Sequence, residues 1–365
     1  MGIIGNLKQN AARDAEIHSG KPCPVCGKGT IPGDHFCYNC SSFLDETGTR
    51  ALTAGEVPEE ELERRVSLNN RAMQDFDNDP QVLEIKRNMK LCMVAMVVGI
   101  ILTFIGSIGL GMLLTIGSVI MGVTLQTKLN GKIPSEHLNS SQFEVMVSKY
   151  LTPHVLDEVF DKVEEFEPRG HISYTVIQDS GLVHKSYNRH SGNHRISGIY
   201  KGVPLEMSNI YLTNETPGDE DNEPKVSVSF NGVWLSFRLN TRFQKEIRIQ
   251  RKRFGQIVNR GIKTDHEEFN RRYVVICEDE AAAFEFLTPQ VMETILKMDD
   301  FAGGKSSIYV KQDGTVWVAI ERSKQILRSG DLNESIPKLR ERMDDELRTV
   351  LMLPSLFLGI HENRI

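Results

Sequence analysis

The sequence predicts a multidomain protein with three parts: a small four-cysteine module, a transmembrane helical hairpin, and an α+β domain whose sheet is largely antiparallel. Two Cys-x-x-Cys pairs predict the first part, and a long run without charged side chains predicts the second. Short strand patterns followed by amphipathic helices predict the third. The predicted boundaries are a flexible N-terminus over 1–20, the module over 21–45, a charged helical linker over 46–90, the hairpin over 91–127 and the α+β domain over 128–365.

The composition is that of an ordinary globular protein and not of a disordered, fibrous or disulfide-rich one. Of the 365 residues, 25% are charged and 40% are hydrophobic, and the net charge is −6. This charge excludes a uniformly basic protein that coats nucleic acid. Six cysteines are too few for a disulfide-dense secreted scaffold. Residues 1–10 lack the apolar stretch and the cleavage site of a secretory signal peptide, so we expect no removal.

Four of the six cysteines have the spacing of a zinc ribbon. Cys23 and Cys26 form one Cys-x-x-Cys pair, and Cys37 and Cys40 form a second pair after ten intervening residues. Each pair can fold into a tight knuckle, and Gly27 allows the turn after the second sulfur. Four thiolates fill a tetrahedral shell and leave no position for water, so we predict structural zinc and not hydrolytic zinc.

Other chemistries open to the same cysteines are two disulfides, a redox pair or an iron–sulfur centre. Redox Cys-x-x-Cys motifs normally occur singly within a thioredoxin-like sheet, which this short segment cannot supply. We interpret His35, close to Cys37, as an exposed loop residue because four cysteines already fill the shell. Thiolate ligands need a reducing compartment, so we expect the module in the cytosol, with zinc supplying much of its folding free energy.

The residues around the cysteines favour protein docking over nucleic-acid binding. Lys21 and Lys28 are accompanied by Asp34 and followed by Asp45 and Glu46, so the basic face that phosphate contacts need is missing. We therefore expect a cytosolic protein to dock on the ribbon.

The charged linker predicts an exposed helix. Residues 59–65 combine four glutamates with two arginines, a pattern typical of local ion pairs. The Asn-Asp-Pro at 78–80 is expected to end this helix. We interpret the charge run as a solvated face with no further function.

The uncharged run from Leu91 to Thr127 predicts a helical hairpin in a lipid bilayer. Its 37 residues would form a helix of about 55 Å, against a hydrocarbon core of roughly 30 Å. The Gly/Ser cluster over 106–111 suits a tight reversal between two arms of about 15 residues each. Apart from the thiol of Cys92 the run contains no ionisable side chain, so the sequence gives no sign of an ion path.

The flanking charges predict a multi-pass protein of the inner membrane with both termini in the cytoplasm. Lys86, Arg87 and Lys90 precede the run and Lys128 and Lys132 follow it, which the positive-inside rule assigns to one side. A single tilted span is the alternative, because each arm is short. Pairs of small residues four apart suit helix packing within the hairpin or between chains. A homo-oligomer is therefore one alternative.

Alternating and β-branched runs predict strands from His171 onward. They cover residues 171–177, 195–200, 203–212, 225–239, 245–249, 273–277, 306–311 and 315–320. Asp313-Gly314 is expected to turn the chain between the last two. Amphipathic helices are predicted over 143–163 with a break at Pro153, over 288–298 and over 336–353.

Four ordered blocks of this part carry a family resemblance. They are Ile196 to Leu205, Phe230 to Trp234, Glu278 to Ala281 leading to Phe286 to Pro289, and Val316 to Ile320. Together they resemble the family catalogued as domain of unknown function 3137. The resemblance covers roughly residues 143–351 and the hairpin. It implies a bacterial membrane protein with two transmembrane helices ahead of a cytoplasmic domain, with the ribbon as an added module, and it brings no catalytic residues.

Three histidines form the most reactive-looking cluster of the domain: His184, His190 and His194. Two histidines four apart share a face only on a helix, and the Ser-Gly-Asn at 191–193 breaks one. We therefore interpret the cluster as a loop ahead of a strand.

Adjacent carboxylates at Glu278, Asp279 and Glu280 are a second candidate for acid–base chemistry. They lie where a strand passes into a helix, and acidic residues there are commonly caps and dipole partners. Cys277 is interpreted as a small core residue. The sequence contains no nucleophile elbow, phosphate-binding loop or zinc-protease motif.

Basic residues outnumber acidic ones between Arg238 and Arg272. Such a patch suits lipid headgroups, an acidic partner or RNA, and solvated strand edges also use Lys and Arg. On the strand that begins near Lys245, Ile247 and Ile249 are expected to face one side and Arg248 the other.

The sequence favours a membrane-anchored, non-enzymatic adaptor that docks a cytosolic protein through its zinc ribbon. The alternative from another class is a membrane-tethered enzyme with its site near the histidines or residues 278–280. Nucleic-acid binding is the third hypothesis, which the scarcity of basic residues on the ribbon disfavours. A pocket that gathers the histidines and acids would favour the enzyme, and a flat surface would favour the adaptor.

Overall fold

The chain divides into two units. The computed structural model describes residues 19–134, 137–218, 223, 225–252, 261–302 and 305–356. One unit is Met1–Leu151 with Ser329–Lys338, and the other is Thr152–Arg328 with Leu339–Ile365. Residues 128–151, which the sequence assigns to the α+β domain, belong to the first unit. The flexible N-terminus predicted over 1–20 falls almost wholly outside the described residues.

The cysteine module is the smallest part of the first unit. Its two strands, β1 (Phe36–Cys37) and β2 (Ser42–Phe43), pair antiparallel. A 3-10 helix, η1 (Ala54–Glu56), leads from the module into α2 (Glu59–Asn78). The described part thus begins as a short ribbon and continues directly into a long helix.

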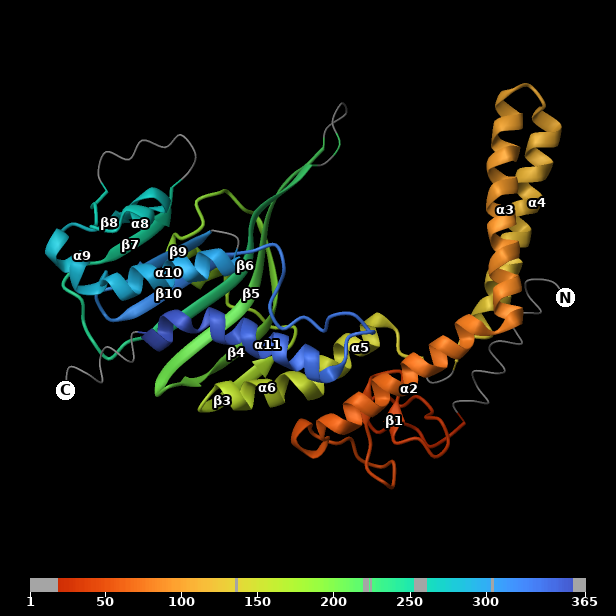
Figure 1. The fold of residues 1–365 in the computed structure, drawn as a ribbon, viewed down its shortest axis with the longest axis horizontal. Coiled ribbons are helices and arrows are strands. Elements are labelled where there is room, and N and C mark those ends of the chain that lie inside the picture. Colours follow the sequence, from red (N-terminus) through yellow and green to blue (C-terminus); the bar gives the residue numbers. More distant parts are fainter. Residues whose placement is uncertain are drawn as a thin grey trace. The chain divides into compact units, whose positions relative to one another are not determined.

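Two long helices follow and form an antiparallel hairpin (Figure 1). They are α3 (Pro80–Phe104) and α4 (Ile108–Asn130). Helix α2 ends at Asn78, as the sequence predicts, and the Asp79 carboxylate accepts a hydrogen bond of 2.6 Å from the Gln81 N–H to cap α3. The reversal occurs at Gly106, whose φ of +101° is accessible to glycine.

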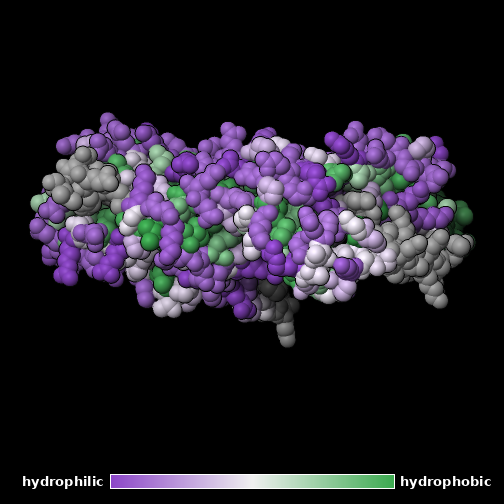
Figure 2. Space-filling model, turned by 90° about the horizontal axis from the view of Figure 1, so that it is seen from below, coloured by the Kyte–Doolittle hydropathy of each residue, from purple (hydrophilic) through white to green (hydrophobic). Residues whose placement is uncertain are grey.

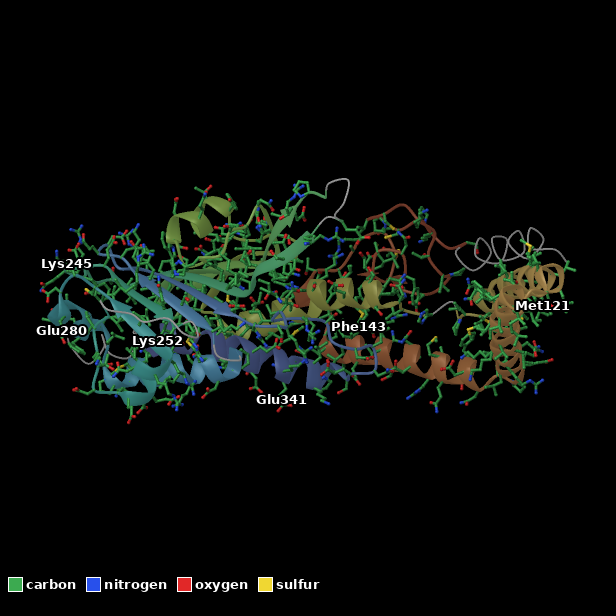
Figure 3. The ribbon with its side chains drawn as sticks, turned by 90° about the horizontal axis from the view of Figure 1, so that it is seen from above. Met121, Phe143, Lys245, Lys252, Glu280 and Glu341 are labelled. Carbon is green, nitrogen blue, oxygen red and sulfur yellow. The ribbon has the colours of Figure 1, made fainter. Side chains whose placement is uncertain are left out.

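The hairpin helices pack closely against one another at two glycines. A Cβ at Gly99 would collide with Thr115, and one at Gly111 would collide with Thr103. Most other side chains of the hairpin face outward: Met121, visible on α4 in Figure 3, is 53% exposed. Both helices are long and apolar enough to cross a membrane, which confirms two candidate spans.

The second unit contains an eight-stranded sheet, and its neighbouring strands all run antiparallel, as predicted. The strand order is β3-β4-β5-β6-β10-β9-β7-β8. The strands are β3 (Lys162–Glu167), β4 (Arg189–Tyr200), β5 (Val203–Thr216), β6 (Lys225–Arg238), β7 (Ile247–Arg251), β8 (Tyr273–Ile276), β9 (Ser306–Val310) and β10 (Thr315–Glu321).

The remaining helices are mostly short. They are α5 (Ser140–Met146), a π-helical turn η2 (Val147–Leu151), α6 (Thr152–Val159), α7 (Tyr174–Ser180), α8 (Glu267–Arg272), α9 (Glu280–Phe286), α10 (Pro289–Ala302) and α11 (Ile336–Val350). In the second unit, α10 and α11 lie on one face of the sheet (Figure 1). A separate core that includes Ile177, Leu182 and Trp234 covers the other face.

Two local predictions for the second unit are wrong. Residues 171–177 contain the start of helix α7 and not a strand, because Ser173 caps the helix and Gly181, with φ +60°, ends it. Strand β4 begins at Arg189, ahead of the predicted start at Arg195, and β3 was not predicted.

The predicted break at Pro153 is also wrong, because α6 follows the π-helical turn without interruption. Pro153 stands in the first turn of α6, where the wider turn before it accommodates a residue without an N–H.

On the face of the molecule seen in Figure 2, hydrophilic side chains predominate and hydrophobic ones form small groups between them.

Candidate metal centre and the base of the hairpin

The structure brings the four predicted cysteines together. The Sγ atoms of Cys23, Cys26, Cys37 and Cys40 all lie within 4.8 Å of one another. Cys23 and Cys40 have an Sγ–Sγ distance of 3.7 Å, and so do Cys26 and Cys37. These distances are far longer than the roughly 2.05 Å of a disulfide. The cluster can hold a metal ion.

Two backbone knuckles present the sulfurs. The Gly27 N–H donates to the Cys23 carbonyl at 2.9 Å, and the Ser41 N–H donates to the Cys37 carbonyl at 2.8 Å. Gly27 has φ +72°, as the sequence predicts, whereas Ser41 adopts φ +54° without being glycine. The hydroxyl of Ser41 donates to the Gln142 carbonyl at 2.8 Å, so contact with α5 helps to hold this left-handed residue.

The four thiols differ in acidity. Burial raises the pKa of the Cys37 thiol well above its ordinary range, and burial also raises the pKa of Cys40. Burial acts in the same direction on Cys26, but hydrogen bonds, chiefly from the Lys28 backbone and from Asn39, lower its pKa to about 7. A metal ion that binds here must therefore displace protons from the thiols, and the proton of Cys37 is the hardest to displace.

Helix α2 packs against the module through a buried arginine. Arg65 is 3% exposed, its guanidinium lies 2.8 Å from the Asp34 carboxylate, and it donates to the Tyr38 hydroxyl at 2.7 Å. Its guanidinium carbon also lies 4.7 Å from the centre of the Phe36 ring. The prediction that this charge run is only a solvated face is therefore wrong for Arg65. Buried Leu62 lies on the same helix face.

The chain that leaves the hairpin also contacts the module. The Phe43 N–H donates to the Tyr150 hydroxyl at 2.9 Å, and the two rings pack edge to face. The Lys149 ammonium donates to the Ser42 hydroxyl at 2.8 Å. The Leu138 N–H also donates to the Asn69 side chain of α2 at 2.8 Å.

The module therefore joins the segment that enters the hairpin to the segment that leaves it. These contacts could not be read from the linker sequence, although Leu62 and Val66, four residues apart and both buried, were a signal of a packed helix face. His35 is exposed and bonds through Nδ1 to the Asp45 carbonyl at 3.0 Å, outside the cysteine cluster, as predicted.

The three histidines of the second unit do not form one site. His190 lies on β4 with its ring 5.2 Å from that of His171, whereas His194 is buried at a bulge of the same strand. Burial lowers the pKa of His194 to about 4. His184 lines a separate pocket. The prediction of a loop is wrong for His190 and His194, which are strand residues.

The predicted carboxylate cluster has structural roles. Asp279 caps α9 by accepting from the Ala281 N–H at 2.9 Å, as predicted, and Glu278 lies 2.8 Å from the Lys245 ammonium. Glu280 lies in the first turn of α9. Cys277 follows β8 and is half-buried, so its prediction as a core residue is wrong.

Acidic partners accompany much of the basic segment. Arg251 forms an ion pair with Asp299, and Arg272 pairs with Glu268 and Asp300. Arg248 lies over the Tyr309 ring at 3.7 Å, on the opposite side of β7 from buried Ile247 and Ile249, as the alternation predicts. Arg253 and Arg260 lie outside the described residues. The described segment thus presents less unpaired positive charge than its sequence suggests.

A family model described as Protein of unknown function (DUF3137) matches residues 228–358, from within β6 to beyond α11. This part of the chain is similar to the DUF3137 family. Three of the four sequence blocks that carry the resemblance fall within the DUF3137 match, and the block from Ile196 to Leu205 precedes it. The match includes neither the cysteine module nor the hairpin.

Other comparisons add little to this assignment. Among solved structures, the crystal structure of the mycobacterial trehalose monomycolate transport factor A, TtfA, aligns with 56% of this chain and 95% of that chain. The sequence identity is 10% and the TM-score is 0.27, too low to define a shared fold. No curated protein matches the chain.

Proposed function

We propose that the chain is a membrane-anchored adaptor in which a structural zinc ion holds the base of a transmembrane hairpin. The observation that carries this proposal is the cysteine cluster fixed between α2 and the segment after α4. The two Sγ–Sγ distances of 3.7 Å support zinc, because a tetrahedron with Zn–S bonds of about 2.3 Å has edges of about 3.8 Å. Four thiolates fill that shell, which suits a structural role.

The two ends of the hairpin belong on one side of the bilayer in this proposal. The Lys132 ammonium donates to the Gln81 side chain at 2.7 Å and lies 3.7 Å from the Asp79 carboxylate, so the base is linked across the two helices. The same end carries Lys86, Lys90 and the other flanking cations of the sequence. By the positive-inside rule this end faces the cytoplasm.

Topology is tested with reporter fusions in a bacterial host. Alkaline phosphatase, active only outside the cytoplasm, is inserted after Gly106 or attached at the C-terminus, and a fluorescent protein that folds in the cytoplasm serves as the reciprocal reporter. The proposal expects phosphatase activity only from the insertion at Gly106. An active C-terminal phosphatase would support the single tilted span and contradict the hairpin.

The module offers an exposed surface for a cytosolic protein. Val25, at the tip of the first knuckle, is 53% exposed although it is apolar, and Cys23 beside it is buried. Because the module is fixed to α2 and α5, a partner that docks there is held at the membrane surface. The dispersal of His184, His190 and His194 favours this role over that of an enzyme.

Docking is tested by photo-crosslinking in cells from an unnatural amino acid at position 25. The matched control carries the same residue at Lys201, an exposed turn position of the second unit. The proposal expects a discrete adduct from position 25 that disappears when Cys37→Ser removes a ligand. Equal adducts from both positions, or none from position 25, would contradict docking on this knuckle.

A further inference from the structure

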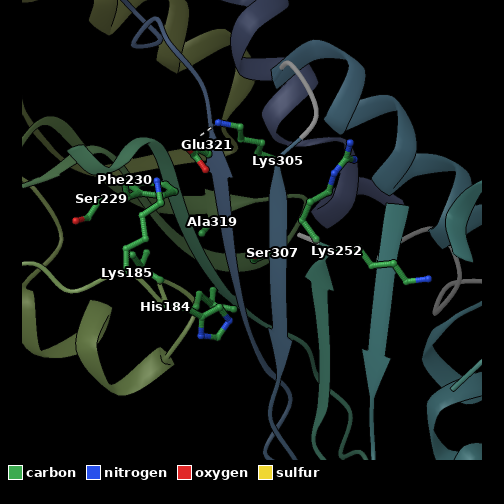
Figure 4. A pocket seen from close by; sticks show the side chains of 12 residues that line it. His184, Lys185, Ser229, Phe230, Lys252, Lys305, Ser307, Ala319 and Glu321 are labelled. Atoms are coloured by element: carbon green, nitrogen blue, oxygen red, sulfur yellow. Dashed lines mark hydrogen bonds and ion pairs between the residues drawn. The ribbon is translucent and has the colours of Figure 1, made fainter. Parts of the chain in front are cut away.

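A pocket of about 420 Å³ lies on one face of the second unit's sheet. Its floor contains Ala319 of β10 and Ser307 of β9, which are cross-strand partners. Larger side chains surround these two small ones, among them Phe230 of β6 and Leu182. The segment that carries His184 and Lys185 forms one side (Figure 4). The hollow exists because two small residues meet where neighbouring strands carry large ones.

The charged side chains around this pocket are mostly basic, but they are not equivalent. Lys305 is 3.0 Å from Glu321, and Arg251 pairs with Asp299. The ammonium of Lys252 bonds to the Asn270 carbonyl and points away from the pocket in Figure 4. Lys185 has no ion pair or hydrogen bond with any residue that the structure describes. One uncompensated cation therefore borders a partly apolar hollow.

We propose that this pocket binds a small organic anion, with its anionic group at Lys185 and its apolar body over Ala319 and Leu182. The volume lies within the range of roughly 300–1,000 Å³ that is usual for small-molecule sites. A lone inorganic anion would leave the apolar floor uncovered, whereas a planar ring bearing a phosphate or carboxylate satisfies both parts of the lining. All lining residues belong to the second unit, so the proposal does not depend on the zinc or docking roles.

The chain contains its own reporter for this pocket. Its two tryptophans are Trp234, the cross-strand partner of Ala319, and Trp317, which packs against the same core. A ligand over Ala319 therefore lies close to the indole of Trp234. Intrinsic fluorescence of the full chain in detergent reports binding, and its emission maximum reports whether each variant is folded.

Pyridoxal 5′-phosphate serves as the probe, because it carries a phosphate on a planar ring and quenches tryptophan by energy transfer. We expect saturable quenching of the wild-type chain. Lys185→Gln removes one charge-assisted contact and should weaken the affinity about tenfold or more. Lys297→Gln, at an exposed position of α10, is the matched control and should bind as the wild type does.

A second readout locates the probe. Its aldehyde condenses with a lysine amine to an imine and releases water, and borohydride then reduces the imine to a stable secondary amine that mass spectrometry can map. Because Lys185 holds the phosphate, we expect the aldehyde to label the neighbouring pocket lysine, Lys305, and we expect this labelling to fall when Lys185→Gln weakens binding or Ser307→Leu fills the floor. Equal quenching of the wild type and Lys185→Gln, or labelling spread evenly over exposed lysines, would overturn the proposal. If inorganic phosphate competes with the same affinity as pyridoxal 5′-phosphate, the ring contributes nothing to binding. That result would overturn the requirement for an organic ligand.

Discussion

The cysteine module and the sheet of the second unit are held together by different means. In the module the four clustered cysteines form a core of their own beside the aromatic residues: Cys23 and Cys37 are buried with Leu44, and Cys26 and Cys40 pack against them. In the second unit, long antiparallel strands bury large side chains such as Trp234, which is fully buried.

We therefore propose that the fold of the module depends on a bound metal and that the fold of the second unit does not. A module of this size buries too little apolar surface to fold alone, so in this proposal metal binding and folding are one event. The sheet derives its stability from hydrophobic burial, which needs no ligand. Loss of the metal should therefore release α2 and the segment after α4 from the module while leaving the second unit folded.

Removal of a metal ligand should have the largest effect. Cys37→Ser is expected to abolish metal binding and to remove about 10 kcal/mol of coupled folding free energy from the module. Limited proteolysis should then cut within residues 21–58, while the thermal transition of the second unit stays unchanged. Cys277→Ser, outside the cluster, is the control. A variant with normal metal content and protease resistance would remove the comparison's basis.

Truncation of a core side chain in the second unit should destabilise that unit and leave the module unchanged. Trp234→Ala is expected to destabilise the second unit by about 4 kcal/mol, because it leaves a cavity beside Phe230. Metal content should stay at the wild-type level. Val226→Ala, at a position 62% exposed, is the control and should change stability little. Thermal unfolding and metal analysis of the same samples measure both quantities, and parallel loss of both would mean that the two regions are not independent.

Loss of the contact between α2 and the module should have a somewhat smaller effect on stability. Arg65→Ala leaves Asp34 beside the aromatic rings without its partner and is expected to cost about 3 kcal/mol. Arg64→Ala is the matched control, because Arg64 pairs with Glu61 on the exposed side of the same helix and should cost less than about 1 kcal/mol. Hydrogen exchange in α2 reports the difference. Equal exchange in the two variants would contradict a stabilising contact between Arg65 and Asp34.

Acid should weaken the second unit through His194. Its pKa is lowered to about 4 in the fold from about 6.5, so below pH 6.5 the unfolded chain binds more protons and stability falls as pH falls. The expected loss between pH 7 and pH 5 is about 2 kcal/mol. His194→Asn should flatten this dependence in denaturant titrations, and His190→Gln should keep it. An unchanged slope in His194→Asn would show that another group is responsible.

Much of the architecture could be predicted because its signals are local. Each of three patterns indicates its structure within a short stretch of sequence. They are the four cysteines in two Cys-x-x-Cys pairs, the uncharged run with central glycines, and the alternating strands. The family blocks from Phe230 onward were recognisable for the same reason. The wrong type of secondary structure was predicted for short segments such as residues 171–177, where the sequence of a short capped helix resembles that of a strand.

What the sequence could not show depends on contacts between distant residues. Arg65 reads as one charge in a solvated run, and only its distance from Asp34 reveals that it is buried. Ser41 gives no sign of its positive φ, which packing against Gln142 stabilises. The pocket over Ala319 likewise arises from cross-strand register, which the strand patterns did not specify.

Native mass spectrometry of the chain in detergent, purified without added metal, tests directly whether the four cysteines hold a structural zinc ion. We expect one zinc ion per chain, with four protons displaced, and complete loss of the zinc in Cys37→Ser. A chain that carries no metal, iron in place of zinc, or a mass lowered by the four hydrogens of two disulfides would contradict it.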